Sequence, residues 1–237
     1  ARRVGKSYLA RRFAENEYKS YIYIDFADIQ KELLDVFENE SHDLDLFFMK
    51  LESYYGVRLE KRNSCIIFDE VQMYPRARQM IKYLVADGRF DYIETGSLVS
   101  IRQNVENIVI PSEEDYIQLN PLNFEEFLMA FGEDELIKYI RTCFCDRKPM
   151  GDLLHRKTLN YFRQYMIVGG MPQAVLKYHE TKSLQDVNAV KERILRLYRQ
   201  DIIKFAKGYE SKVLAIFDEI PSQLTKHEKK FSLASLS

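Results

Sequence analysis

Three short apolar runs alternate with helical patterns in the first part of this 237-residue chain. The runs are 21–26 (YIYIDF), 65–68 (CIIF) and 92–95 (YIET), and each is bounded by polar residues. β-branched and aromatic residues are typical of strands, and strands that alternate with helices favour a parallel sheet. The sequence therefore predicts an α/β fold for this part, with helices at 8–16, 28–39, 43–55 and 75–85.

Helical patterns predominate after Pro121. Asn123 with Glu126 three residues later has the form of a capping box, and Gly132 is typical of a helix end. These signals predict an α/β domain over 1–122 and a helical domain, acting as a lid, over 123–207. The expected helices of the second domain are 124–131, 134–145, 152–167, 172–180 and 183–206.

The composition excludes several classes of protein. The 35 basic and 36 acidic residues leave a net charge of -1, which excludes a globally basic nucleic-acid binder and a disordered acidic chain. Three cysteines without a Cys-x-x-Cys pair argue against a disulfide framework and structural zinc, and they favour a cytoplasmic location. No apolar run approaches the roughly 20 residues that span a bilayer, so we expect no membrane partner.

Gly5-Lys6-Ser7 is the strongest chemical signal in the sequence. A phosphate-binding loop (Walker A) has the form G-x-x-x-x-G-K-[ST], in which lysine reaches the phosphates and the hydroxyl ligates magnesium. The first glycine of that pattern would fall one residue before Ala1, so we expect the chain to be a fragment. The alternative for these residues is a polar turn before a helix.

Asp69 and Glu70 follow the second apolar run directly. A nucleotide hydrolase needs a carboxylate at the end of a strand beside the phosphate loop to hold magnesium, and Asp69 is placed for that role (Walker B). Glu70 suits a general base that orients the attacking water. The alternative for this pair is a solvated turn or an N-cap.

Thr95 and Ser97 come at the end of the third run, where a polar side chain could sense the γ-phosphate. We assign that role to Ser97, the alternative being a helix N-cap. Ligands of open α/β sheets gather at the carboxyl ends of strands. Lys6, Asp69 and Ser97 are therefore expected to converge at one edge of the sheet.

Six short motifs occur in order along the whole chain: ARRVGKS at 1–7, YIDF at 23–26, FDEVQ at 68–72, TGS at 95–97, LNPLNFEEFL at 119–128 and GGMP at 169–172. The set resembles that of the prokaryotic AAA-type ATPases that pair an N-terminal P-loop domain with a C-terminal domain of unknown function. The resemblance implies ATP and Mg2+ as cofactors, with Lys6 and Ser7 on the phosphates and metal, Asp69 on the metal and Glu70 as the base. We expect Glu70, Lys6 and Ser97 to be the catalytic residues, and we expect the nucleotide to lie against Arg3, Val4, Gly5, Lys6, Ser7 and Tyr8.

The chain departs from this family at both ends. The strand before the phosphate loop and the first loop glycine are missing, so we expect weak ATP binding or inactivity of the truncated chain itself. The family also continues past the last residue here. We therefore expect 208–237 to be the start of a truncated winged-helix-like domain.

The favoured function is that of an ATPase which binds MgATP, hydrolyses it to ADP and phosphate, and couples this to movement of attached domains. The alternative is an ATPase-derived binding module that contacts DNA or a protein partner through its C-terminal helices. Basic residues along 188–207 support the alternative, but Glu192 and Asp201 interrupt them, so a solvated helix face is favoured. Cys143, Phe144 and Cys145 are expected to be buried packing residues.

Overall fold

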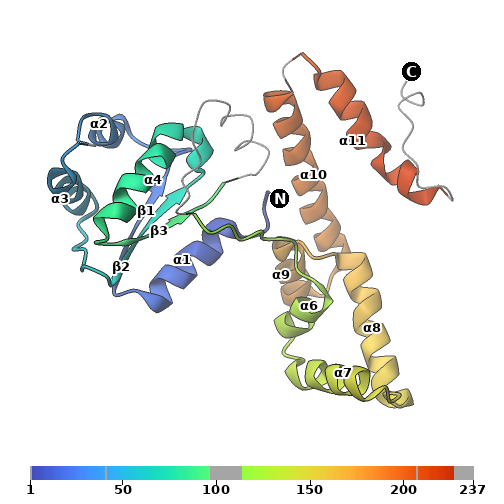
Figure 1. Ribbon diagram of the computed structural model, residues 1–237. Coiled ribbons are helices and arrows are strands. Elements are labelled where there is room, and N and C mark those ends of the chain that lie inside the picture. The colour runs from blue at the N-terminus through green and yellow to red at the C-terminus, as the bar shows by residue number, and fades with distance from the viewer. Residues whose placement is uncertain (1, 41, 97–113, 207, 227–237) are drawn as a thin grey trace. The chain divides into compact units, whose positions relative to one another are not determined.

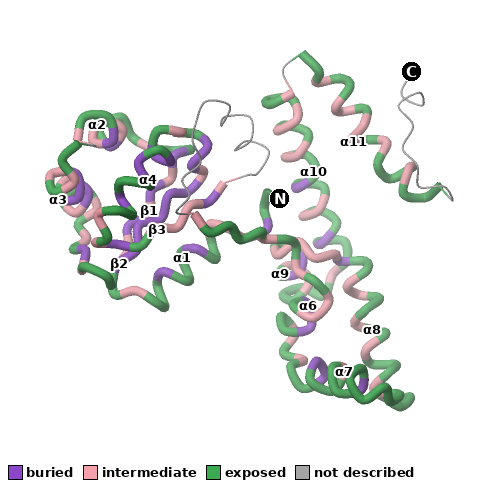
Figure 2. The backbone as a smooth tube through the Cα atoms, viewed as in Figure 1, coloured by how far each residue is buried: buried purple, intermediate pink, exposed green. Residues whose placement is uncertain are grey.

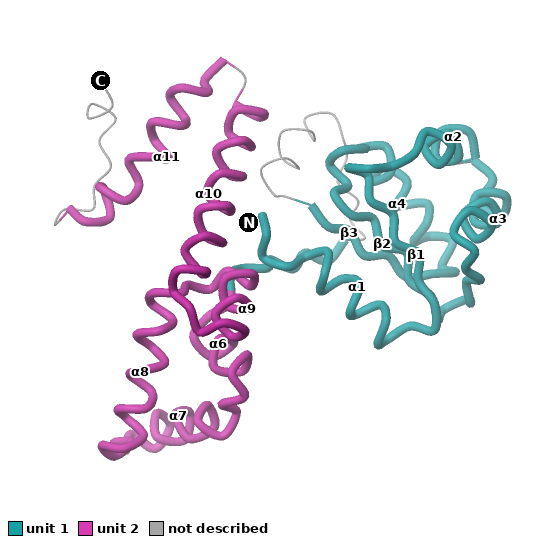
Figure 3. Tube along the Cα trace, turned by 180° about the vertical axis from the view of Figure 1, so that it is seen from behind, with its two compact units in different colours: residues 1–121 teal, residues 122–237 magenta. Residues whose placement is uncertain are grey.

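The computed structural model describes residues 2–40, 42–96, 114–206 and 208–226. The chain divides into two compact units, Ala1–Pro121 and Leu122–Ser237, which Figure 3 distinguishes by colour. The first unit carries the described strands and the second is helical, as the change of pattern after Pro121 indicates.

A three-stranded parallel sheet forms the centre of the first unit (Figure 1). Its strands are β1 (Ser20–Asp25), β2 (Ser64–Asp69) and β3 (Asp91–Glu94), in that spatial order. Asp25 pairs with Asp69, and Phe68 pairs with Glu94, so the three strands end at the same edge. The predicted parallel α/β architecture is confirmed in this sheet.

One face of the sheet is covered by three helices, α2 (Lys31–Asn39), α3 (Leu44–Tyr55) and α4 (Pro75–Asp87). Side chains alternate along a strand, so Ile22 and Ile24 of β1 face the same core as Ile66 and Phe68 of β2. Buried phenylalanines of α2 and α3 complete this core, in edge-to-face contacts typical of packed aromatic rings. Figure 2 shows the buried residues concentrated on these elements.

The opposite face of the sheet carries α1 (Lys6–Glu17). Small residues, Ala10 and Ala14, allow this helix to lie close to Cys65 and Ile67 of β2. Tyr21 and Tyr23 of β1 pack against the same cluster and are half-buried. The alternation of β2 also places Asp69, two residues after Ile67, on the face that α1 covers.

The second unit consists, in its described part, of α6 (Phe124–Ala130), α7 (Asp134–Asp146), α8 (Asp152–Val168), α9 (Pro172–Thr181), α10 (Leu184–Phe205) and α11 (Glu210–Thr225). The predicted capping box is confirmed, because Asn123 accepts from the Glu126 N–H while Glu126 accepts from the Asn123 N–H. Phe127 of α6 and Val187 of α10 meet in the core of this unit.

Gly170, in the motif 169–172, makes a close backbone contact with Leu122. The Leu122 N–H donates to the Gly170 carbonyl at 2.7 Å, and a Cβ on Gly170 would lie 2.0 Å from the Leu122 carbonyl oxygen. A side chain cannot occupy that space. Glycine is therefore required here for packing within the second unit.

The expectation for Cys143, Phe144 and Cys145 is wrong for two of the three. Cys143 is buried, but Cys145 is exposed and Phe144 is 84% exposed. All three lie in α7, where successive residues point about 100° apart, so three consecutive side chains spread over about 200° of the helix and do not all face the side that is covered. Among the residues that the structure describes, no helix is both long and apolar enough to cross a membrane.

Candidate functional site

The start of α1 has the local features of an anion-binding site. Gly5 precedes the helix with a φ of 94°, a left-handed conformation that favours glycine, and it has no side chain to accept from the first helical N–H groups. Lys6 and Ser7 are the first two helical residues and are half-buried. Free backbone N–H groups at the positive end of a helix attract phosphate.

The residues around this turn differ in exposure. Val4 is buried, whereas Arg3 and Tyr8 are exposed. Arg3 also adopts a left-handed φ of 67°. The phosphate loop therefore has one anchored apolar residue and two side chains that reach solvent.

Asp69 is the last residue of β2, and its carboxylate is buried, with 3% of the residue exposed. It accepts hydrogen bonds from three hydroxyl groups. Ser7 Oγ donates to Asp69 Oδ1 at 2.8 Å. Thr95 Oγ1 donates to the same oxygen, and the Tyr23 hydroxyl donates to Oδ2. These donors come from the start of α1, the residue that follows β3 and the middle of β1. Three elements thus meet on one carboxylate at the carboxyl edge of the sheet.

Glu70 leaves the strand in a left-handed conformation, with a φ of 52°. The short helix η1 (Val71–Met73) follows, and its buried Gln72 donates from Nε2 to Glu70 Oε2. The Val71 N–H donates to the Thr95 carbonyl at 3.0 Å, which joins this turn to β3. The Glu70 carboxylate is therefore held by a residue of its own turn, and that turn is joined to the end of β3.

The structure brings Ser7 and Asp69 together and places Glu70 next in sequence. Thr95, which we considered beside Ser97 for the third strand end, contacts Asp69 directly. Ser97 lies outside the described residues. Sequence reasoning assigned no role to Tyr23 or Gln72. The alternation of 21–26 indicates the face on which Tyr23 lies, but its contact with Asp69 depends on the register of β1 against β2.

The donor atoms fit a magnesium ion that is completed by phosphate. Among the described residues, no group of three or more His, Cys, Asp or Glu side chains could hold a metal alone. Magnesium commonly takes one or two carboxylates and completes its shell with waters and substrate phosphates. The hydroxyl of Ser7 and the carboxylate of Asp69 supply a donor set of this kind.

A cluster of charged side chains around the buried Arg78 lies on the other face of the sheet, at the end of β3. Arg78 of α4 makes a bidentate pair with Glu114, at 3.1 and 2.6 Å, and lies 3.6 Å from Glu94. Burial, and then the nearby Glu114 carboxylate, raise the pKa of Glu94 to about 8. Glu94 therefore holds its proton at neutral pH, and Arg78 is balanced by Glu114.

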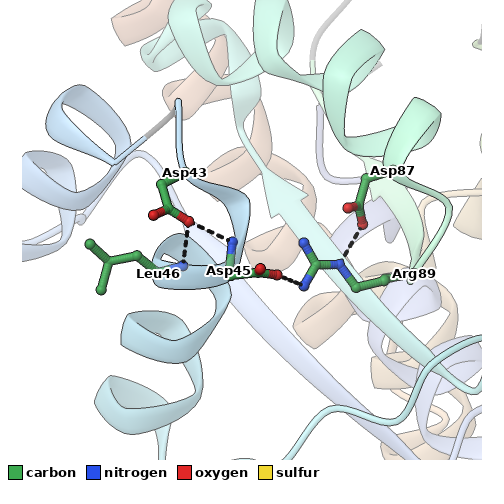
Figure 4. Close-up of polar contacts among 5 residues, drawn as sticks. All are labelled: Asp43, Asp45, Leu46, Asp87 and Arg89. Carbon is green, nitrogen blue, oxygen red and sulfur yellow. Dashed lines mark hydrogen bonds and ion pairs between the residues drawn. The ribbon is translucent and has the colours of Figure 1, made fainter.

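A depression of about 560 Å³ lies at the opposite edge of the sheet, near the residues that lead into β2 and β3. Arg89 is one of the residues that line it and pairs with Asp45 and Asp87, as Figure 4 shows. Asp43 caps α3 by accepting from the N–H groups of Asp45 and Leu46. These contacts tie the start of α3 to the turn after α4, so we assign Arg89 a structural role.

The parallel sheet and the carboxylate site agree with a nucleotide-binding protein of the ATPase type, and the comparison with known families supports that class. A family model described as an AAA domain matches residues 1–128, which is more than half of the chain, so the chain belongs to that family. A model described as a domain of unknown function (DUF8612) matches residues 159–237. The resemblance to AAA-type ATPases with a C-terminal domain of unknown function is thus confirmed. No curated protein and no solved structure matches the chain.

Proposed function

We propose that this protein binds MgATP at the carboxyl edge of its sheet and hydrolyses it to ADP and phosphate. The observation that carries the proposal is the hydrogen bond from Ser7 Oγ to Asp69 Oδ1, at 2.8 Å. It joins the residue after the lysine of the phosphate loop to the carboxylate at the end of β2. This is the pairing that a P-loop nucleotide hydrolase needs.

The roles of the residues follow from their positions. The backbone N–H groups after Gly5 would receive the phosphates, and Lys6 would reach their β- and γ-oxygens. Arg3, Val4 and Tyr8 would flank the nucleotide. Ser7 and Asp69 would hold magnesium, which neutralises charge on the phosphates when it is bound. Ser97 would sense the γ-phosphate, a role inferred from its place after β3 in the sequence.

Glu70 would orient the water that attacks the γ-phosphate and accept its proton. The support is its position beside Asp69 and the donor that Gln72 provides to Oε2. Because that bond leaves Oε1 as a further acceptor, Glu70 can bind Gln72 and a water at once. Gln72 thereby limits the orientations that the Glu70 carboxylate can adopt.

We further propose that ATP occupancy moves attached domains, with 123–207 as a helical lid and 208–237 as the start of a winged-helix-like domain. The described part of 208–237 is 208–226, and it consists of a short turn and the helix α11, which has Pro221 within it. Phosphate-bound loops that relax after hydrolysis are a common means of such coupling.

The rival reading, a module that binds DNA or protein through its basic helix, has less specific support. In α10, Arg199 pairs with Asp218 of α11 at 2.6 Å, and Lys191 donates to the Ile167 carbonyl at 2.7 Å. Two of its basic side chains thus have partners within their own unit. The ATPase proposal remains the one that the geometry favours.

The test is MgATP binding and turnover by the full-length gene product. Lys6→Ala should weaken nucleotide binding, whereas Glu70→Gln should keep binding and lower kcat by about a hundredfold or more. The matched controls are Lys19→Ala and Glu60→Gln, because these residues form an exposed ion pair elsewhere. Undiminished turnover in both Lys6→Ala and Glu70→Gln would overturn the proposal.

A further inference from the structure

We propose that Tyr23 is a positioning residue that orients the metal-binding carboxylate of Asp69 through its hydroxyl group. This inference rests on the proposed function of the site, because it assigns Asp69 to magnesium. Tyr23 itself reaches neither nucleotide nor metal in this role. It acts through the hydrogen bond that its hydroxyl donates to Asp69 Oδ2.

The Tyr23 hydroxyl holds the oxygen of the Asp69 carboxylate that Ser7 and Thr95 do not contact. A carboxylate has about four acceptor positions, two on each oxygen. Oδ1 of Asp69 accepts from both Ser7 and Thr95, whereas Oδ2 accepts from Tyr23. When the Ser7 oxygen serves as a metal ligand, Thr95 and Tyr23 are the side chains that still hold the two oxygens. Each then fixes one end of the carboxylate plane.

The ring of Tyr23 is itself fixed from α1. The Arg11 guanidinium lies over it, 3.5 Å from the ring centroid. Ser7 and Arg11 are four residues apart on one helix, so they share a face. The same helix face therefore supplies the hydroxyl that meets Asp69 and the cation that covers Tyr23.

The Tyr23 hydroxyl is well suited to this role, because it donates its proton to Oδ2 of Asp69 while Ser7 and Thr95 donate to Oδ1. Outer partners that orient a metal ligand typically alter metal affinity by roughly 10- to 100-fold when they are removed.

Tyr21 provides a matched control on the same strand. It lies two residues before Tyr23, on the same face of β1, and it packs in the same cluster. Its hydroxyl also donates to a carboxylate of α1, Glu15, at 3.2 Å. Tyr21→Phe thus removes the same atom from the same surface without touching Asp69.

The experiment is a magnesium titration of fluorescent ATP binding by the full-length protein, with Tyr23→Phe, Tyr21→Phe and Lys6→Ala in parallel. We expect Tyr23→Phe to raise the half-saturating magnesium concentration by about tenfold, with unchanged affinity for metal-free ATP. Manganese binding to the ATP complex, followed by electron paramagnetic resonance, should weaken by the same factor. Tyr21→Phe should match the wild type in both measurements.

The outcomes separate the two proposals. If Lys6→Ala weakens nucleotide binding while Tyr23→Phe and Tyr21→Phe have the same magnesium dependence, the role of Tyr23 is refuted and the site stands. If Lys6→Ala leaves nucleotide binding unchanged, the proposed function fails, and the role of Tyr23 fails with it. Equal loss of metal-free ATP binding in both tyrosine variants would mean a packing role only, and it would also refute the inference.

Discussion

Ser7 and Asp69 are separated by 62 residues of sequence, yet Ser7 Oγ lies 2.8 Å from Asp69 Oδ1. The contact forms because α1 begins at Lys6 on the face of the sheet toward which Asp69 points. A helix start and a strand end thereby share one hydrogen bond. The donor that would ligate magnesium is thus already placed against its carboxylate partner.

Two replacements of Ser7 test whether its hydroxyl group is the part of the side chain that binds magnesium. We expect Ser7→Ala to raise the magnesium concentration for half-maximal ATP turnover by roughly 10- to 100-fold, since a metal ligand is lost. Ser7→Thr keeps the hydroxyl and should stay within about threefold of the wild type. A magnesium titration of steady-state turnover measures both. Identical curves for Ser7→Ala and the wild type would exclude Ser7 as a ligand.

Glu94 should make the stability of the first unit depend on pH. Its pKa is raised from 4.5 to about 8 in the folded state, so the folded protein binds one proton more than the unfolded chain between these values. Stability then falls as pH rises through this window, by up to about 1.4 kcal/mol per pH unit. Glu94→Gln mimics the protonated form and should flatten this dependence.

Urea unfolding of the wild type, Glu94→Gln and Glu114→Gln at pH 5.5 and 8 provides the measurement. Glu94→Gln should be more stable than the wild type at pH 8. Glu114→Gln should be destabilised at both pH values, by about 3 kcal/mol, because it leaves the buried Arg78 without its bidentate partner. Parallel pH profiles for the wild type and Glu94→Gln would contradict the assignment.

Gly170→Ala should destabilise the second unit by at least about 2 kcal/mol, because the new Cβ would overlap the Leu122 carbonyl oxygen. The Leu122 backbone is also bonded to the Gly170 carbonyl and to the Tyr165 hydroxyl, so it cannot shift freely. Gly132→Ala is the control: its φ is 71° and its Cβ site is open, so it should cost only about 1 kcal/mol. Thermal unfolding followed by circular dichroism compares them, and equal losses would refute the steric argument.

Arg89→Met should weaken the junction between α3 and the turn after α4. The Arg89 side chain is 20% exposed, bonds Asp45 and Asp87, and lies 4.7 Å from the Phe48 ring centroid. We expect a loss of about 1–3 kcal/mol at pH 7. Arg12→Met, which removes an exposed pair with Glu15, should change stability by less than about 0.5 kcal/mol.

The pH dependence of this loss has a definite sign. The hydrogen bond with Arg89 holds the pKa of Asp87 below its ordinary value of 3.8. That contribution is present above the ordinary value and disappears as Asp87 is protonated at lower pH. The gap between the wild type and Arg89→Met in urea unfolding should therefore narrow from pH 7 toward pH 3, and a gap that widens would contradict the ion-pair explanation.

The elements of the fold could be predicted because their signals are local. The β-branched and aromatic residues of 21–26 and the helical spacing of 43–55 identify β1 and α3 without knowledge of their neighbours. The capping box at Asn123 is likewise contained within four residues. Exposure in α7 was harder, because the face that a helix buries depends on what packs against it, and only Cys143 of the three residues is covered.

The residues of the candidate site form two groups, those that local motifs identify and those that only the folded structure reveals. The sequence alone determined the residues that have a chemical signature, Gly5-Lys6-Ser7 and Asp69-Glu70, and it placed them at a loop and a strand end. Only the tertiary structure decided that Tyr23 and Thr95 complete the contacts of Asp69, because these depend on which residues of β1 and β3 stand beside the end of β2. A motif can be recognised because its residues are adjacent in the sequence. Contacts between distant segments depend on strand register and helix packing, which the sequence does not display.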